Sequence, residues 1–208
     1  KYFNDIDSSI KAYWLGFLMA DGANSNESLE VRLSIKDIKH LEQFKKDIKS
    51  TNAILTGKSL CSLSKYNDLY EWCHFSIHSK VMTKNLEKWG IVPNKTGEES
   101  FPNINNKYHP DFIRGYFDGD GCYTYCYRLN KEKYKTLNSS IKIVCMNYKF
   151  LLDIKNILVE QANIEDKKIH IYKSNSIWSL EICSNDSIEK FYNYIYPKYC
   201  RRYLKRKR

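Results

Sequence analysis

The sequence lacks several features that would assign it to a common class of protein. No apolar run reaches the roughly 18 residues that a membrane-spanning helix requires, and no secretory signal pattern opens the chain. The seven cysteines are an odd number without regular spacing, which argues against a disulfide framework and indicates a reducing compartment. Cys122 and Cys126 have neither a second cysteine pair nor a nearby histidine to complete a zinc site. We therefore expect a soluble, intracellular protein with no membrane partner, in a bacterial or phage-host cytoplasm or in an organelle.

Proline is also scarce, with four in 208 residues. Three of the four fall within residues 93–110, a polar stretch that is typical of a linker. This linker separates a first half, residues 1–92, from a second half, residues 111–208, which ends in the basic tail RRYLKRKR.

The two halves have the same order of predicted elements, which indicates an internal duplication. In the first half we expect helix 9–20, strand 29–36, helix 39–50, a strand pair within 53–78 and helix 80–89. In the second half we expect helix 111–119, strands within 122–146, helix 149–161, a strand pair within 168–183 and helix 187–194.

The strands carry a polar face. In LEVRLSIK, apolar residues alternate with Glu30, Arg32, Ser34 and Lys36, as in a sheet that is covered on one side only. The formal net charge is +10, from 34 basic and 24 acidic residues, so a polyanion is the expected partner of these faces. For any single residue, ordinary solvent exposure is the alternative.

Two further segments alternate in the same way. WCHFSIH places Trp72 and His74 on the polar side, and SSIKIVC places Lys142 there.

Two apolar segments, YWLGFLMADG and FIRGYFDGDG, are near copies of each other. Gly16 and Ala20 in the first, like Gly115 and Gly119 in the second, are four residues apart and form a ridge of small residues on a helix. Such ridges allow close approach of two helix backbones, so we expect the two helices to pack together between the halves.

Both segments end in an acidic residue followed by glycine. We expect Gly22 and Gly121 to be left-handed helix caps, which puts Asp21 and Asp120 on the last helical turn. An acid there opposes the helix dipole at a cost of a few tenths to about 1 kcal/mol. Two carboxylates with free helix-end carbonyls form an oxygen-rich cluster suited to a hard divalent cation such as Mg²⁺. The alternative is that both acids simply begin Asp-Gly turns.

The segments WLGFLMADG and IRGYFDGDG resemble the two copies of the LAGLIDADG motif in single-chain, two-repeat homing endonucleases. The resemblance implies an α/β (α+β) fold of two pseudo-twofold related αββαββα repeats. The motif helices would form the interface, and two saddle-shaped antiparallel sheets would lie in the major groove of double-stranded DNA. It implies a monomer that makes a double-strand break in a long, asymmetric target during homing of a mobile intron or intein.

The same resemblance implies roles for particular residues. Asp21 and Asp120 correspond to the metal-binding acids at the scissile phosphates, with the carbonyls of Ala20 and Gly119 as further ligands. The expected cation is Mg²⁺, with Mn²⁺ as a substitute and with Ca²⁺ bound without cleavage. Lys36 corresponds to a basic residue that positions or polarises the attacking water.

The halves depart from each other and from the motif. Met19 replaces the usual first acid, which Asp118 keeps, but this position is not the metal ligand. The point equivalent to Lys36 is expected at Asn147, so the halves would differ chemically.

DNA contacts are expected from the polar strand faces and from a basic hairpin in the second half. The residues expected to contact DNA are Arg32, Ser34, Trp72, His74, Arg128, Lys131, Lys133, Lys135, Lys142 and Lys173. Lys173 and the C-terminal tail are equally consistent with solvated charges.

Three other functions remain open. The chain could be an inactive relative that serves as an RNA-splicing maturase or a DNA-binding regulator, although both acids and Lys36 are present. An intein domain would lack its splicing portions here, because Lys1 is no splicing nucleophile and the chain does not end in His-Asn. A small-molecule enzyme is disfavoured by the charge and the motifs together.

Overall fold

The computed structural model describes residues 2–60, 69–129 and 135–208. Of the strand residues at 126, 128, 129 and 135–137 it describes the backbone alone. The first half contains α1 (Ser9–Asp21), β1 (Gly22–Asn24), β2 (Ser28–Ser34), the 3-10 helix η1 (Ile35–Asp37), α2 (Ile38–Asp47), β3 (Leu55–Leu60), β4 (Leu69–His78) and α3 (Lys80–Glu87). The second contains η2 (Asn106–Tyr108), α4 (His109–Asp120), β5 (Gly121–Leu129), β6 (Lys135–Cys145), α5 (Tyr148–Gln161), η3 (Asp166–Lys168), β7 (Ile169–Ser174), β8 (Ile177–Ile182) and α6 (Asn185–Ile195).

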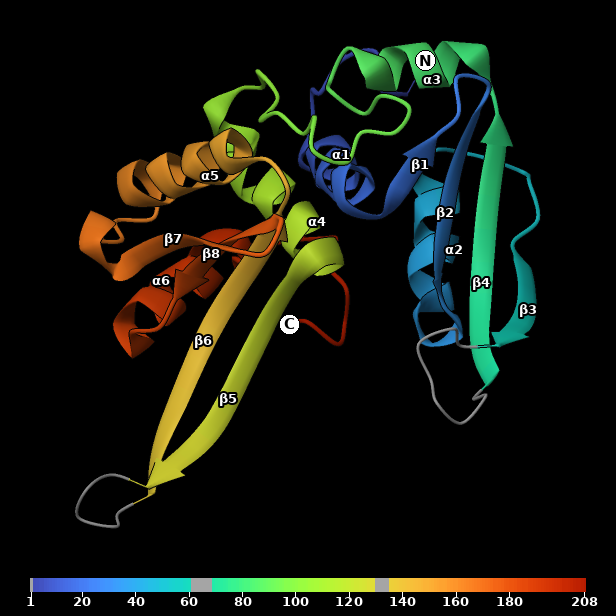
Figure 1. Cartoon of the computed structure of the whole chain (residues 1–208). Coiled ribbons are helices and arrows are strands. Elements are labelled where there is room, and N and C mark those ends of the chain that lie inside the picture. The colour runs from blue at the N-terminus through green and yellow to red at the C-terminus, as the bar shows by residue number, and fades with distance from the viewer. Residues whose placement is uncertain (1, 61–68, 130–134) are drawn as a thin grey trace.

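Each half therefore has the order αββαββα, which confirms the expected fold class. The strand orders are β1-β2-β4-β3 and β5-β6-β8-β7, and every pair of neighbours is antiparallel. In Figure 1 the two sheets stand on either side of α1 and α4, and the β5–β6 hairpin projects beyond the body of the second half. β1 was not expected, because three residues are too few to show an alternating pattern.

Alternation explains how each sheet is covered. Leu29, Val31 and Leu33 of β2 are buried, whereas Arg32 between them is exposed. Helix α2 packs on the apolar side, where the Phe44 ring lies 5.9 Å from that of β4 Phe75. The helices thus leave one polar face on each sheet.

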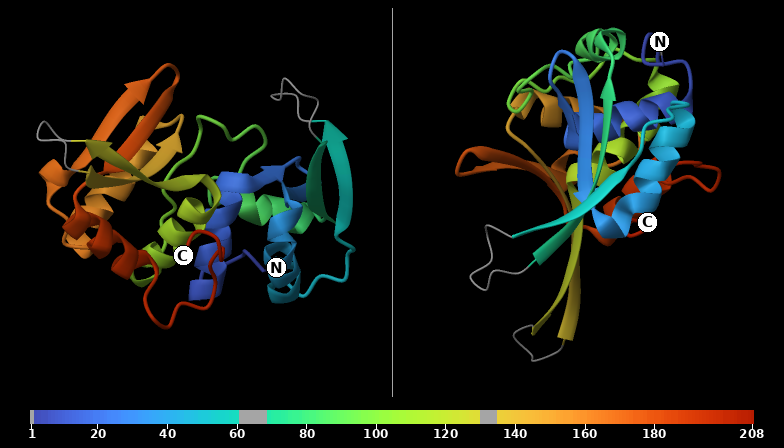
Figure 2. Two further views of the ribbon diagram at one scale, coloured as in Figure 1. Left: turned by 90° about the horizontal axis from the view of Figure 1, so that it is seen from below. Right: turned by 90° about the vertical axis from the view of Figure 1, so that its right-hand side faces the viewer.

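Helices α1 and α4 pack at the centre of the molecule, between the sheets (Figure 2). Residues 12–19 of α1 are all buried, because other elements surround this helix on every side. A Cβ atom at Gly16 would lie 2.0 Å from the Phe112 carbonyl oxygen, and one at Gly115 would lie 2.0 Å from that of Tyr13. Only glycine permits this backbone contact.

The expected left-handed caps are wrong. Gly22 has φ −82° and ψ 140°, and Gly121 has φ −78° and ψ 156°, so both are extended. The reason is that each helix runs directly into a strand, with Gly22 paired to Val31 and Gly121 paired to Ile143. Glycine is needed for space, because a Cβ would lie 2.6 Å from the Leu18 carbonyl oxygen at Gly22 and 2.0 Å from the Phe117 ring at Gly121.

None of the helices in the described part of the chain combines the length and apolarity that crossing a bilayer requires.

Candidate functional site

Two carboxylates meet where α1 and α4 end. Asp21 and Asp120 are the last residues of these helices. Asp21 Oδ2 would lie 3.1 Å from a Cβ at Gly119, so its carboxylate is packed against the opposite helix. Burial, and then the charge of Asp120, raise the pKa of Asp21 to about 6. The pKa of Asp120 is also raised, chiefly by desolvation.

Two lysines that the sequence had not singled out complete this cluster. Lys95 Nζ donates to the Ala20 carbonyl at 3.5 Å and to that of Gly22. Lys207 Nζ donates to the Gly119 carbonyl at 3.3 Å and to that of Gly121.

The two lysines occupy equivalent positions. Ala20 and Gly119 each precede the terminal acid, and Gly22 and Gly121 each follow it. Each ammonium group therefore neutralises the negative end of one motif helix, where an acid alone would be unfavourable.

Electrostatics couple the lysines to the acids. Burial lowers the pKa of Lys95, and the charges of Asp120, Glu99 and Asp21 oppose that shift. Burial and the nearby Arg206 lower the pKa of Lys207. Partly desolvated amines beside two carboxyl groups of raised pKa are a pattern that is common at functional sites.

The donor set fits a hard divalent cation in part. Asp21 and Asp120 supply carboxylate oxygens, which such ions prefer. The carbonyls of Ala20 and Gly119, expected as further ligands, accept hydrogen bonds from lysine ammonium groups instead. Across the described ranges no group of three His, Cys, Asp or Glu side chains is arranged to hold a metal. Further ligands would have to be water or substrate oxygens, which Mg²⁺ commonly retains.

Lys36 is exposed in η1, directly after β2. With Asp37, His40 and residues 201–205 of the tail it lines a hollow of about 350 Å³. The expected equivalence of Lys36 with Asn147 stays a prediction. Alignment on the strand register, with Val31 opposite Gly22 and Ile143 opposite Gly121, places the counterpart of Lys36 one residue after Asn147, and alignment on the helix starts places it one residue before.

Comparison with known proteins agrees with this geometry. The sequence profile described as the LAGLIDADG-like domain matches residues 108–196. The structure of meganuclease I-SmaMI bound to uncleavable DNA matches with a TM-score of 0.61 and 13% identity, over 91% of this chain and 85% of that one. The homing endonuclease I-WcaI, bound to its DNA recognition sequence, matches with a TM-score of 0.62 and 14% identity, over 100% of this chain and 86% of that one.

The chain is a LAGLIDADG-fold protein.

Two further comparisons bear on function. A structure of I-SmaMI bound to uncleaved DNA target in the presence of calcium ions matches with a TM-score of 0.55 and 13% identity, over 89% of this chain and 84% of that one. Full-length DUF199/WhiA from Thermatoga maritima matches with a TM-score of 0.57 and 17% identity, over 90% of this chain and 55% of that one. No curated protein sequence matches the chain significantly.

The polar face of the first sheet carries Arg32, Trp72 and His74, with Glu30 Oε2 3.5 Å from His74 Nε2. The Arg32 guanidinium lies over the Trp72 ring, 4.3 Å from its centroid, and both side chains donate to Ser59 Oγ, at 3.1 and 2.9 Å. In the strand register Arg32 faces His74, and Ser34 faces Trp72. These four predicted DNA contacts thus share one surface.

The second sheet places its two predicted contacts on different faces. Lys142 Nζ lies 5.2 Å from the Tyr172 ring centroid, on the polar face. Lys173 pairs with Trp178, which pairs with the buried Cys145, so Lys173 lies on the opposite face and its expected place on the polar face is wrong. Of the predicted hairpin contacts, Lys131 and Lys133 lie outside the described residues. Arg128 lies in β5 and Lys135 in β6, and for these two residues the structure describes the backbone alone.

Asp118, the first acid of the second LAGLIDADG motif, is completely buried. It accepts hydrogen bonds from Tyr13 Oη at 2.7 Å, from Tyr196 Oη, and from the Leu204 amide at 2.6 Å. Burial raises its pKa. This acid therefore ties α1 and the tail to α4.

Side-chain contacts anchor the tail that carries Lys207 on the first repeat. Arg202 makes a bidentate pair with Asp47, at 2.5 Å from Nε and 2.6 Å from Nη2. Arg206 Nε lies 3.1 Å from Asp37 Oδ2. Solvated charge is therefore the wrong description of this part of the tail.

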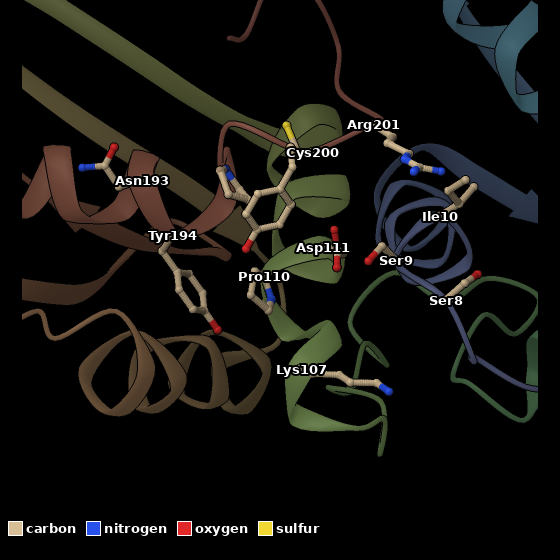
Figure 3. Close-up of a pocket in the computed structure, with 12 residues that line it drawn as sticks. Ser8, Ser9, Ile10, Lys107, Pro110, Asp111, Asn193, Tyr194, Cys200 and Arg201 are labelled. Carbon is tan, nitrogen blue, oxygen red and sulfur yellow. The ribbon is translucent and has the colours of Figure 1, made fainter.

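A hollow of about 660 Å³ lies at the other end of the motif helices (Figure 3). Ser8 and Ser9 from the start of α1, Pro110 and Asp111 from the start of α4, and Tyr194 of α6 are among its lining residues. It is separated from the carboxylates by the length of α1, roughly 20 Å at 1.5 Å per residue.

Proposed function

We propose that this protein is a site-specific DNA endonuclease that cuts both strands of a long, asymmetric target by Mg²⁺-dependent hydrolysis, in the homing of a mobile intron or intein. The observation that carries the proposal is the pair of motif-end carboxylates with one lysine at each helix end. The DNA-bound structures of I-SmaMI and I-WcaI, which have this fold, support DNA as the substrate.

Hydrolysis joins a water oxygen to phosphorus and breaks the bond from phosphorus to the 3′ oxygen. Asp21 and Asp120 would hold Mg²⁺, which supplies Lewis-acid polarisation of the phosphate and a more acidic water. Lys95 and Lys207 would hold positive charge against the developing phosphorane-like transition state. Because burial lowers their pKa, each could also give a proton to the departing 3′ oxygen.

Two lysines at equivalent helix ends suggest one reaction site for each DNA strand. Lys95 would serve the site at the end of α1, and Lys207 the site at the end of α4. Asp21 and Asp120 lie between them and would contribute to both.

DNA would lie along the polar sheet faces, with the strands in the major groove. Arg32, Ser34, Trp72 and His74 of the first repeat would contact it, as would Lys142 of the second. Basic side chains there would hold phosphates or read base edges. The hairpin residues Arg128, Lys131, Lys133 and Lys135 remain proposed contacts on the basis of sequence.

We also propose that Mn²⁺ replaces Mg²⁺ and that Ca²⁺ supports binding without cleavage. The I-SmaMI structure with uncleaved DNA and calcium ions supports the second part of this proposal. A monomer is expected, because one chain supplies both repeats.

The test is strand-resolved, single-turnover cleavage of a target selected from a random DNA library. Asp21→Asn and Asp120→Asn should each lower the cutting rate of both strands by at least about 100-fold, because the shared cation site is lost. Lys95→Met and Lys207→Met should each slow mainly one strand, and not the same one. DNA binding in Ca²⁺ should remain. An Asp120→Asn protein that cuts at the wild-type rate would rule out the site.

Lys36→Met belongs in the same experiment. We keep Lys36 as a candidate for positioning the attacking water, although the amines in contact with the helix ends are Lys95 and Lys207. A slower cut with unchanged affinity would assign it to the chemistry. Reduced affinity at an unchanged rate would make it a phosphate contact.

A DNA-binding regulator or RNA-splicing maturase is the second candidate. The match to DUF199/WhiA favours it, since that chain shares the fold but is not described as a meganuclease. Tight, sequence-selective binding without any Mg²⁺- or Mn²⁺-dependent nicking would support this candidate.

A further inference from the structure

Each lysine at the candidate site is carried by a segment that the opposite repeat holds. Lys207 belongs to the tail of the second repeat, and its neighbour Arg206 pairs with Asp37 of the first, with Nε at 3.1 and 3.3 Å from the two carboxylate oxygens. Lys95 follows the first repeat, and two residues later the Gly97 carbonyl accepts from Asn147 Nδ2 of the second repeat at 3.1 Å.

Asp37 and Asn147 occupy similar places in the two repeats, between the second strand and the helix that follows it. Each is the N-cap of the helix that follows the second strand of its sheet, α2 in the first repeat and α5 in the second. Asn147 both caps its helix, accepting from the Phe150 amide at 3.3 Å, and holds the Lys95 segment.

Asp37 departs from the usual behaviour of a cap. Aspartate is among the favoured N-cap residues because its carboxylate accepts from the first turn of the helix. Asp37 makes no such bond, and its side chain is only 8% exposed. Asp37 is the last residue of η1, which begins after Ser34 and runs directly into α2, so no local cap bond is required of it. Its carboxylate is directed to Arg206.

We propose that Asp37 and Asn147 are positioning residues, each of which holds the lysine-bearing segment of the opposite repeat at its helix end. Asp37 of the first repeat thereby places Lys207 at α4, and Asn147 of the second repeat places Lys95 at α1. The catalytic part of this inference rests on the proposed function. The mechanical part, which is the attachment of the two segments, does not.

Other contacts keep the segments near their sites when these bonds are lost. Arg202 remains paired with Asp47, and the Leu204 amide with Asp118. At the start of the Lys95 segment, Asn24 Nδ2 of the first repeat donates to the Ile91 carbonyl at 2.8 Å. Loss of Asp37 or Asn147 should therefore displace one ammonium group without detaching the whole segment.

The test uses two nearly isosteric exchanges in the full chain. Asn147→Asp keeps the N-cap acceptor of α5, and Asp37→Asn removes no cap bond from α2, so both helices should stay folded. The first removes the charge that holds Arg206, and the second removes the donor to Gly97. Asp166→Asn is the matched control, because it breaks an ion pair of 3.0 Å with Lys155 that touches neither segment.

Two quantities are measured for each variant. The first is the rate at which trypsin cleaves the folded protein within the tail and after Lys95, measured by mass spectrometry of the intact products. This measurement needs neither metal nor DNA. The second is the single-turnover cutting rate of each strand, with Lys95→Met and Lys207→Met identifying the strand that each lysine serves.

Asp37→Asn should speed release of the last residues and slow the Lys207 strand about tenfold relative to the other. Asn147→Asp should speed cleavage after Lys95 and slow the Lys95 strand instead, and Asp166→Asn should change neither. Equal slowing of both strands, or trypsin rates like those of the wild type, would overturn the proposal. If the wild type cuts no DNA, the proposed function fails, and the trypsin measurement still decides whether these residues hold the segments.

Discussion

Asp21 ionises in surroundings that oppose its charge, and this makes a prediction about stability. Its pKa is about 6 in the folded chain, against 3.8 for an aspartate in water. When folding raises the pKa of a carboxyl group, ionisation of that group lowers the free energy of unfolding. The loss is absent at pH values below the unfolded-state pKa and is complete at pH values above the folded-state pKa. Asp21→Asn should therefore raise the free energy of unfolding at pH 8 by up to about 3 kcal/mol and change little near pH 4.

Denaturant unfolding in EDTA at the two pH values measures this difference. Adding Mg²⁺ at pH 8 should stabilise the wild type and leave the variant unchanged, because only the wild type has both carboxylates. A variant less stable than the wild type at pH 8 would mean that Asp21 forms a net favourable contact in the apo protein.

The two acids and the two lysines differ in how far sequence alone could find them. Asp21 and Asp120 follow from two matching ten-residue segments, because a local motif fixes their place on a helix. Lys95 and Lys207 lie in a linker and a tail without any repeated pattern. Only packing of the whole chain brings them to the helix ends, so no local signal identifies them.

Among the elements, the α1–α4 interface gives the sharpest test of packing. Alanine in place of glycine normally stabilises a helix interior by about 1 kcal/mol. At Gly16 the new Cβ would lie 2.0 Å from the Phe112 carbonyl oxygen, so the helices would have to separate. We expect Gly16→Ala to destabilise the protein by about 2 kcal/mol or more, with a melting temperature lower by several degrees. Melting at or above the wild-type temperature would contradict this contact.

The elements themselves were largely predictable. Alternation along LEVRLSIK predicted β2 and its buried face, because a sheet with one covered side requires that pattern. The cap at Gly22 was not predictable, because an Asp-Gly pair is compatible with both a left-handed turn and an extended exit. The choice depends on pairing of Gly22 with Val31, which is a contact between segments.

At the scale of the whole molecule, the net charge of +10 and the Arg32–Trp72 and Lys142–Tyr172 pairs on the polar sheet faces make a prediction about binding. The logarithm of DNA affinity should fall linearly with the logarithm of salt concentration, by about 0.9 per phosphate contacted. Lys142→Ala should reduce this slope by about one contact. Lys46→Ala is the control, since Lys46 lies on α2, behind the first sheet. A slope that does not respond to Lys142 would remove that residue from the interface.

The two motif helices differ by one methyl group at the position where Ala20 faces Gly119. A Cβ at Gly119 would lie 2.4 Å from that of Ala20, so the alanine of α1 fits only because α4 has glycine at the facing position. Two copies of the first repeat, docked in the same way, would force two alanine methyl groups into that space. The interface therefore selects for unlike partners, and the first repeat on its own is barred from the symmetric dimer that a duplicated architecture would otherwise allow.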